Sequence, residues 1–374
     1  MEALHQALDD ARRRYADANP RSQAADGQAQ PYLPGGNTRS VLHFQPFPLT
    51  MARGEGAELV DLDGHRYVDF VGEFSAGLFG HSDQAIKSAV REALDLGLVM
   101  GAPTMLEKEL ACLICNRFPP VEQLRFCNSG TEAGIMAVTT ARVVTGRPKV
   151  LVFRGAYHGG VIKFPTGNYA MNVPYDYVLA EYNDVDGTAE AIRETGDQLA
   201  AVVVEPVLGA GGNIPGTRVF LEMLRQTTSD VGALLIFDEV KTARLGPAGL
   251  QGMLGIDPDL TMLGKIIGGG LPTGAFGGRA ELMAIYDPRR EASWQHAGTF
   301  NNNVCSMAAG IAALKMVYTP ERAEEFFQWS EAFRISLNEM FAAQKAPVVC
   351  NGLGSMFAVQ LRREPLERMG VRNA

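Results

Sequence analysis

The sequence predicts an α/β fold in which a large, mostly parallel β-sheet is covered by helices on both faces. Beyond residue 100, short apolar runs rich in Val, Ile and Leu alternate with segments whose apolar residues recur about every 3.6 positions. Strands that helices cover on both faces have this nearly continuous apolar composition. The runs expected to form strands are LRFC, KVLVF, YDYVLA, AAVVVEP, ALLIFDEV, LTMLG and GAFGG.

The two ends of the chain differ from this central pattern. Residues 1–19 predict a surface amphipathic helix that ends before Pro20, and residues 20–40, rich in Gly, Pro, Ser and Asn, predict a loop. ELVDLDGHRYVDF carries two alternating runs around Asp63-Gly64 and predicts a β-hairpin. From about residue 302 the chain becomes helical, which indicates a second, smaller domain.

Composition limits the class of protein. A chain of 374 residues, 46% hydrophobic and 20% charged, suits a soluble globular enzyme with a large core. The net charge of -8 argues against a nucleic-acid-binding surface, which needs a basic field. No apolar run reaches the roughly 18 residues of a membrane span, and the first residues lack the apolar stretch of a signal peptide. We therefore expect a cytoplasmic protein without a membrane partner.

The five cysteines predict reduced thiols, because their number is odd and their spacing irregular. Cys112 and Cys115 form a C-x-x-C that could bind a metal or act in redox chemistry. They lie in a segment of helical spacing, and no second C-x-x-C or H-x-H group completes a tetrahedral site. Buried cysteines on a helix face are favoured, and no metal is expected.

Polar residues follow several of the apolar runs, and ligands of an open parallel sheet bind outside the carboxyl ends of its strands. NSGTE, at Asn128–Glu132, follows LRFC and opens a helix, so its backbone N–H groups and hydroxyls could bind an anion. An ordinary helix N-cap prefers the same residues, and the two interpretations have equal weight.

Asp238 ends the strand ALLIF, where a carboxylate is rarely buried unless it pairs with a cation. Asp238-Glu239 could also be the metal-binding acids of a Walker B strand. No G-x-x-x-x-G-K-[ST] loop occurs in the chain, so an ATPase is excluded.

Lys265 follows the strand LTMLG and precedes a glycine stretch. An apolar setting lowers the pKa of a lysine, as an imine-forming amine needs, and glycines let a bulky ligand approach the backbone. The alternative is a surface lysine beside a flexible loop; Lys241, the comparison, has no glycine stretch after it. Together, a phosphate cradle, an acid and an imine-forming lysine indicate pyridoxal 5'-phosphate.

Six motifs resemble those of the class III aminotransferases of fold type I, in the same order. They are NSGTEA, GAYHG, VVVEP, FDEV, GKIIGGGLPTGAFGGR and HAGTFNNN. The glutamate-1-semialdehyde aminomutase branch is the most similar subgroup, and within it PGGNTRSVLHFQPFPL and HAGTFNNNV resemble β-amino-acid (β-phenylalanine-type) aminotransferases. The resemblance runs from about residue 30 to about residue 360. It implies a doubly wound large domain, expected at 61–300, with residues 1–60 joining a small carboxy-terminal α/β domain at 301–374.

The resemblance also implies roles for single residues. Ser129–Thr131 would bind the cofactor phosphate, and Tyr157 would stack on the pyridine ring. Asp238 would pair with the ring nitrogen, and Val240 would pack on the opposite face of the ring. Lys265 would hold the cofactor covalently and transfer protons as general acid and base.

Three further residues extend this site by the same resemblance. Thr299 would reach the phosphate of a neighbouring subunit, which implies an active homodimer. Arg39 would bind the substrate carboxylate with its planar fork, the alternative being a surface loop arginine. Glu205 is similar to a family residue on the O3' side of the cofactor.

Two departures from the family pattern stand out. Gly134 replaces the usual Asn after NSGTEA, and a glycine inside a helix is expected to cost about 1 kcal/mol against Ala. The family pattern also continues for several dozen residues beyond the stretch resembling CNGLGSMFAVQL, so the small domain is expected to be shortened. This would affect the substrate pocket and the binding of a dicarboxylate acceptor.

The function expected from the sequence is a transaminase that moves an amino group from a β-amino acid to a keto acid in a ping-pong cycle. The first alternative is glutamate-1-semialdehyde 2,1-aminomutase, which needs no amino acceptor. The second is a cofactor-binding homologue without turnover. A nicotinamide-dependent dehydrogenase is disfavoured, because no strand-linked G-x-G-x-x-G occurs.

Overall fold

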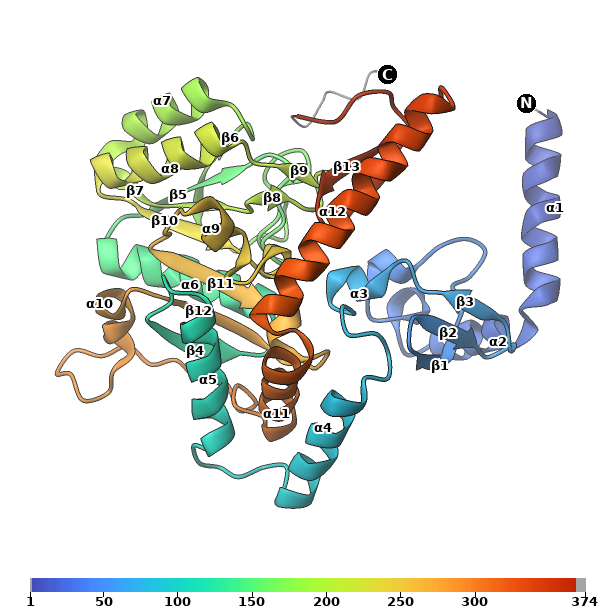
Figure 1. The fold of residues 1–374 in the computed structure, drawn as a ribbon, viewed down its shortest axis with the longest axis horizontal. Helices are drawn as coiled ribbons and strands as arrows, with labels where there is room; N and C mark the ends of the chain where they lie inside the picture. The colour runs from blue at the N-terminus through green and yellow to red at the C-terminus, as the bar shows by residue number, and fades with distance from the viewer. Residues whose placement is uncertain (1, 368–374) are drawn as a thin grey trace. The chain divides into compact units, whose positions relative to one another are not determined.

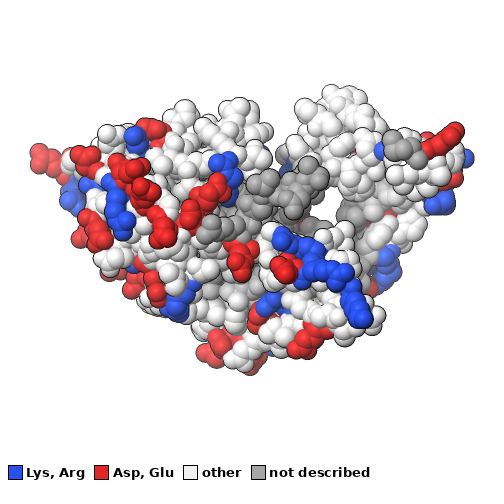
Figure 2. All heavy atoms as spheres, turned by 90° about the horizontal axis from the view of Figure 1, so that it is seen from above, with Lys and Arg blue, Asp and Glu red and all other residues white. Residues whose placement is uncertain are grey.

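The structure is a computed structural model that describes residues 2–367 (Figure 1). Its contacts divide the chain into two compact units, Met1–Asp83 and Gln84–Ala374. Acidic and basic side chains are intermixed on the face of the molecule shown in Figure 2. Among the described residues, none of the helices has the length and apolar character needed to cross a membrane.

The first unit combines helices with a three-stranded antiparallel sheet of order β1-β2-β3. Its elements are α1 (Glu2–Ala18), α2 (Pro20–Ala29), the 3₁₀ turns η1 (Pro34–Gly36) and η2 (Ser40–Leu42), β1 (Met51–Glu55), β2 (Glu58–Asp61), β3 (Arg66–Val68) and α3 (Gly72–Ser75). The predicted first helix and the predicted hairpin are both confirmed, since β2 and β3 pair antiparallel.

The prediction of a loop over residues 20–40 is wrong for its first half, which is helix α2. Pro20 stands in the first turn of this helix, where its missing N–H is not needed. Asp63 caps the helix from the hairpin, because its carboxylate accepts hydrogen bonds from the backbone N–H groups of Arg21 and Ser22 at 2.8 and 3.0 Å. This cap lies 42 positions away from Arg21 in the sequence, beyond the reach of local composition.

The second unit is built on a seven-stranded sheet of order β4-β12-β11-β10-β7-β5-β6. Its strands are β4 (Gln123–Cys127), β5 (Lys149–Phe153), β6 (Asp176–Ala180), β7 (Leu199–Val204), β10 (Leu234–Asp238), β11 (Leu260–Gly264) and β12 (Gly274–Gly278). All seven predicted strands are therefore confirmed. Only β12 runs antiparallel to its neighbours, β11 and β4, so the sheet is mostly parallel as predicted.

Helices cover both faces of this sheet (Figure 1). Helix α6 packs against β12, β11 and β7, whereas α8 packs against β10 and β7 and α7 against β6. The helices of this unit are α4 (Gln84–Leu96), α5 (Met105–Arg117), α6 (Gly130–Thr145), α7 (Val185–Thr195), α8 (Arg218–Val231), α9 (Gly249–Leu254), α10 (Ala280–Met283), α11 (Val304–Ala312) and α12 (Pro320–Ala343). The residues of β7 are all fully buried, which explains its uninterrupted apolar sequence.

Shorter elements connect this framework. Two two-stranded antiparallel sheets are formed by β8 (Val207–Leu208) with β9 (Ile214–Pro215) and by β13 (Val349–Leu353) with β14 (Met356–Gln360). Single helical turns are η3 (Gly196–Gln198), η4 (Thr242–Leu245), η5 (Lys265–Gly268), η6 (Ala284–Tyr286) and the π-helical η7 (Ala313–Val317). The predicted helical region beyond residue 302 is confirmed by α11 and α12.

Gly134 is a close-packing position of α6. A methyl group on its Cα would lie 2.7 Å from the His158 carbonyl oxygen and 2.9 Å from Met262 Cε. The expected loss of helix stability relative to Ala is therefore opposed by a gain in packing, because only a glycine lets α6 approach the backbone at His158 this closely.

The cysteine pair of α5 is less buried than predicted. Cys112 is exposed and Cys115 is half-buried, and all five cysteines are free thiols. The predicted helix is confirmed, but the prediction of burial is wrong for Cys112, because the face of α5 that carries this residue is directed to solvent. Among residues 2–367, no group of three or more His, Cys, Asp or Glu side chains could hold a metal ion.

Candidate active site

The polar residues predicted at strand ends meet along one edge of the large sheet. Asp238 is the last residue of β10, and Lys265 follows the last residue of β11. Ser129 follows β4 by two positions, and Glu205 comes directly after β7. Since these four strands run parallel to one another, their carboxyl ends lie on the same side.

Ser129 is the N-cap of α6, as the helix-cap interpretation expects. Its Oγ accepts a hydrogen bond from the Glu132 backbone N–H at 3.2 Å, and the Glu132 carboxylate accepts one from the Asn128 backbone N–H at 2.9 Å. The cap leaves the first backbone N–H groups of the helix, at Gly130 and Thr131, without intrahelical acceptors. Cap and anion site are therefore compatible, because the Ser129 hydroxyl uses only one N–H of the first turn.

Val240 packs against the backbone on both sides of the site. A methyl group on Gly130 would lie 2.8 Å from Val240 Cγ1, and one on Gly264 would lie 3.2 Å from the same atom. The two glycines thus let the α6 turn, the end of β11 and the Val240 side chain come together. The start of α6 and the residue before Lys265 are fixed relative to each other by this contact.

Asp238 is paired with His158, a residue to which the sequence analysis assigned no role. Both side chains are buried, and Asp238 Oδ2 lies 2.9 Å from His158 Nδ1. The other carboxylate oxygen accepts the Val240 backbone N–H at 3.0 Å. His158 Nε2 is buried without a hydrogen-bond partner among the described residues, which is unusual for a buried ring nitrogen. The only sequence signal for this contact was its place beside Tyr157 in GAYHG.

Glu205 fixes the backbone at Tyr157 by hydrogen bonding. Its two carboxylate oxygens accept hydrogen bonds from the backbone N–H groups of Tyr157 at 2.9 Å and Gly209 at 3.0 Å. Burial raises the pKa of Glu205 to about 7, although the neighbouring His158 acts in the opposite direction. Tyr157 itself remains 47% exposed, so the residue is accessible to a ligand.

Lys265 has a left-handed backbone conformation with φ of 51°, rare for a residue with a side chain. Such a conformation costs on the order of 1–3 kcal/mol and is found mainly where a site needs it. The half-buried Lys265 side chain leaves the sheet directly after the fully buried strand β11.

Lys241 is a second lysine at the same edge of the sheet. Its Nζ donates a hydrogen bond to Asn213 Oδ1 at 2.8 Å. Burial lowers the pKa of Lys241 to about 8, with an opposing contribution from Glu205 and a further lowering from Lys265. The sequence analysis used Lys241 only as a comparison, because its contacts come from residues distant in the sequence.

Two predicted residues lie outside this cluster. Thr299 is exposed in a turn and lines a separate cavity of about 470 Å³, together with Phe300 and the segment Leu98–Thr104. Arg39 belongs to the first unit, where it forms an ion pair with Glu73 and its guanidinium lies 5.2 Å from the centre of the Phe74 ring. The roles of both residues remain predictions.

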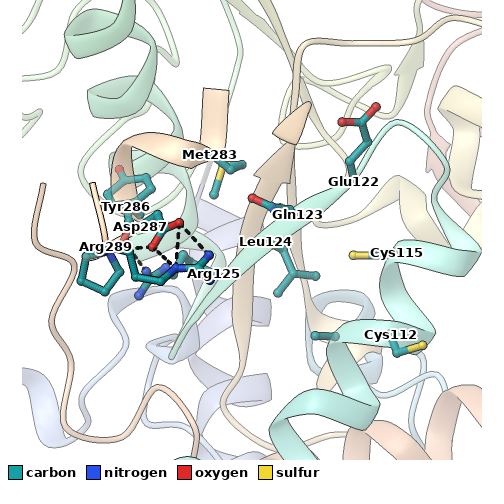
Figure 3. A pocket seen from close by; sticks show the side chains of 12 residues that line it. Cys112, Cys115, Glu122, Gln123, Leu124, Arg125, Met283, Tyr286, Asp287 and Arg289 are labelled. Atoms are coloured by element: carbon teal, nitrogen blue, oxygen red, sulfur yellow. Dashed lines mark hydrogen bonds and ion pairs between the residues drawn. The ribbon is translucent and has the colours of Figure 1, made fainter. Parts of the chain in front are cut away.

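A second cavity, of about 530 Å³, contains the cysteine pair (Figure 3). Cys112 and Cys115 line one side of it from α5. Arg125 of β4 also lines it, as do Asp287 and Arg289, which form an ion pair at 2.7 Å. The cavity includes none of the residues at the strand-end cluster.

Comparisons with known proteins agree with this geometry. The sequence pattern of the family described as aminotransferase class-III matches residues 41–370. The chain belongs to the class III aminotransferases. It is 51% identical over 95% of its length to a β-phenylalanine transaminase of Variovorax paradoxus and spans 81% of that protein. It is 39% identical to a glutamate-1-semialdehyde 2,1-aminomutase of Geobacillus thermodenitrificans, covering 92% of this chain and 84% of that one.

A solved structure gives the same result for the fold. The crystal structure of a β-phenylalanine aminotransferase from Variovorax paradoxus superposes on this aminotransferase with a TM-score of 0.95 at 49% identity, covering 98% of this chain and 85% of that one. The predicted family, fold type, enzyme class and pyridoxal phosphate cofactor are thereby confirmed.

The strand-end residues fit this cofactor. The free backbone N–H groups at the start of α6 suit a phosphate, and the buried Asp238 carboxylate suits a protonated ring nitrogen. The half-buried Lys265 amine suits a carbonyl group. Donor, acceptor and amine therefore occur on one sheet edge in the combination that pyridoxal phosphate requires.

Proposed function

We propose that this aminotransferase takes the amino group of an aromatic β-amino acid of the 3-amino-3-phenylpropanoate type and transfers it to a keto acid. The observation that carries the proposal is the 51% identity, over 95% of the chain, to a transaminase named for β-phenylalanine. The identity to aminomutases is lower, 39%. The strand-end cluster supplies the residues that transamination needs.

Binding and orientation of the cofactor fall to residues at the ends of β4 and β10. The backbone N–H groups of Gly130 and Thr131 bind the phosphate, and the α6 dipole adds to this attraction. Thr131 Oγ1 also accepts the Gly160 backbone N–H at 3.2 Å and so fixes the loop that carries Tyr157. Asp238 keeps a proton on the ring nitrogen, and His158 orients the Asp238 carboxylate.

Lys265 moves the proton on which the reaction depends. Bound pyridoxal phosphate supplies an aldehyde that condenses with amines and a protonated ring that accepts electron density. Lys265 Nζ would hold the cofactor and would remove a proton from the carbon that bears the substrate amino group. The Lys265 backbone is left-handed at the point where the chain leaves β11.

The substrate carboxylate is assigned to Arg39, whose guanidinium offers bidentate hydrogen bonds. Its present partner, Glu73, lies in a stretch with three consecutive non-glycine residues of positive φ, Glu73 to Ser75. The proposed role requires Arg39 to exchange this exposed ion pair for the substrate. Exposed ion pairs contribute little stability, so the exchange costs little.

We also propose that the enzyme acts as a cytoplasmic homodimer in which Thr299 reaches the phosphate of the neighbouring subunit. Support comes from a run of exposed apolar side chains that an isolated chain would leave in water. The run comprises Leu96, Leu98, Val99 and Met100, and three of these line the same cavity as Thr299. Five free thiols suit a reducing compartment.

The visible absorption spectrum with added pyridoxal phosphate tests the proposal. The wild type should form a cofactor band that bleaches on addition of 3-amino-3-phenylpropanoate and returns on addition of 2-oxoglutarate or pyruvate. Lys265→Ala should lose the bleaching and the turnover, whereas Lys345→Ala, an exposed lysine, should keep both. Formation of more than one equivalent of 3-oxo acid per enzyme only when a keto acid is present would exclude an aminomutase.

Two results would contradict the proposal. A band that ignores the β-amino acid but responds to glutamate-1-semialdehyde, with no need of an acceptor, would favour the aminomutase. A band that responds to no amine would favour a homologue without turnover.

A further inference from the structure

Two lysines leave adjacent parallel strands at the same edge of the sheet. Lys241 comes three residues after the end of β10, and Lys265 comes directly after β11. The residues before them are in contact, since a methyl group on Gly264 would lie 3.2 Å from Val240 Cγ1. The two side chains therefore start from backbone segments that pack together.

The Lys241 ammonium group is bound to the loop between β8 and β9. Its Nζ donates to Asn213 Oδ1 at 2.8 Å. A methyl group on Gly209 would meet Lys241 Nζ at 3.3 Å and Glu205 Oε2 at 3.0 Å, so the ammonium and the Glu205 carboxylate face the same glycine. This hydrogen bond and this packing fix the charge in position.

The charged groups that face Lys241 come from three further elements. Glu205, at the end of β7, favours the charged ammonium, whereas Lys265 and Arg244 of η4 oppose it. Burial acts in the same direction as these two cations and is the largest influence, so that the pKa of Lys241 falls to about 8. Lys241 thus remains mostly charged at neutral pH, and its interaction with Lys265 is repulsive.

We propose that Lys241 is a positioning residue of the reaction, which places a second positive charge beside Lys265 and so favours the uncharged form of the Lys265 nitrogen. Electrostatic repulsion is reciprocal, so a cation that resists protonation of Lys241 has its own protonation resisted equally. An uncharged amine is the nucleophile and the base, and a nearby cation is one way in which an enzyme keeps a lysine in that form. The inference rests on the proposed role of Lys265.

The test is a pH titration of the visible absorption of the cofactor-loaded enzyme, whose midpoint reports protonation of the nitrogen that joins Lys265 to the cofactor. Lys241→Met and Lys241→Gln should each raise this midpoint by about one pH unit, because the repelling charge is gone. Lys241→Arg keeps the charge and should leave the midpoint within about 0.3 units of wild type. The Gln variant also keeps a hydrogen-bond donor for Asn213, which separates charge from local structure.

Three outcomes would overturn the inference. The first is an unchanged or lowered midpoint in both uncharged variants. The second is an equal shift in the Arg variant, which would indicate a structural cause. The third is a higher KM for the keto acid without any change in the midpoint, which would assign Lys241 to carboxylate binding. A wild type that forms no cofactor band would instead refute the role of Lys265.

Discussion

Replacing Gly134 by Ala tests the packing of α6 against the loop that carries His158. In an isolated helix this substitution would stabilise by about 1 kcal/mol. Here the added methyl group would lie 2.7 Å from the His158 carbonyl oxygen, so either α6 or the loop must move. Overpacking of this kind costs about 1–3 kcal/mol, and the second contact, with the flexible Met262 terminus, adds less. We therefore expect a net loss of about 1 kcal/mol in the free energy of unfolding.

The measurement is denaturant unfolding of wild type and Gly134→Ala, followed by the pyridoxal phosphate dissociation constant of each. His158 is the hydrogen-bond partner of Asp238, so its displacement should lower cofactor affinity together with stability. Gly27→Ala is the matched control, because Gly27 lies inside α2 and a methyl group there would meet nothing within 4 Å. It should stabilise its own unit by up to about 1 kcal/mol. A Gly134→Ala protein more stable than wild type would refute the packing argument.

Three other substitutions test separate parts of the molecule. Burial raises the pKa of the fully buried Glu239 from 4.5 to about 7, so its stabilising contribution is complete below pH 4.5 and is lost as pH rises to 7. Glu239→Gln should remove on the order of 3 kcal/mol of that pH dependence; an equally steep denaturation profile between pH 4.5 and 8 would contradict it. His158→Phe removes a hydrogen bond to Asp238 and should weaken cofactor binding about tenfold, measured by absorbance titration, whereas an unchanged constant would argue against an orienting role. Arg39→Ala should raise the KM for the β-amino acid at least about tenfold without altering the cofactor band, and an unaffected KM would return Arg39 to a surface role.

The large sheet could be predicted because each of its strands has a recognisable apolar sequence. A strand buried on both faces has to be apolar throughout, and β7 and β10 are read directly from Leu199–Val204 and Leu234–Asp238. Helix α2 could not be predicted in this way. Its cap is Asp63, which is distant in the sequence, so the composition of residues 20–29 alone does not indicate the helix.

The same distinction applies to the site. Asp238 and Lys265 could be predicted because each stands at the end of an apolar strand, and the parallel topology then brings strand ends together. The roles of His158 and Lys241 could not be predicted, because they depend on partners that are distant in the sequence, Asp238 and Asn213. Cys112 shows the converse case, in which a helical spacing gave the helix correctly but not the face that it buries.

The buried ionisable groups at the strand ends form one electrostatic unit. Asp238 is paired with His158, Glu205 receives two backbone N–H groups, and Lys241 is bound by Asn213. Each of these groups has a partner within the chain, so the charge around Lys265 is arranged before any ligand binds. Fixed charges need no reorganisation when the reaction begins, which is the general advantage of a preorganised site. The strained backbone of Lys265 is stabilised by this same packing, because the contact between Val240 and Gly264 leaves the end of β11 little freedom to relax.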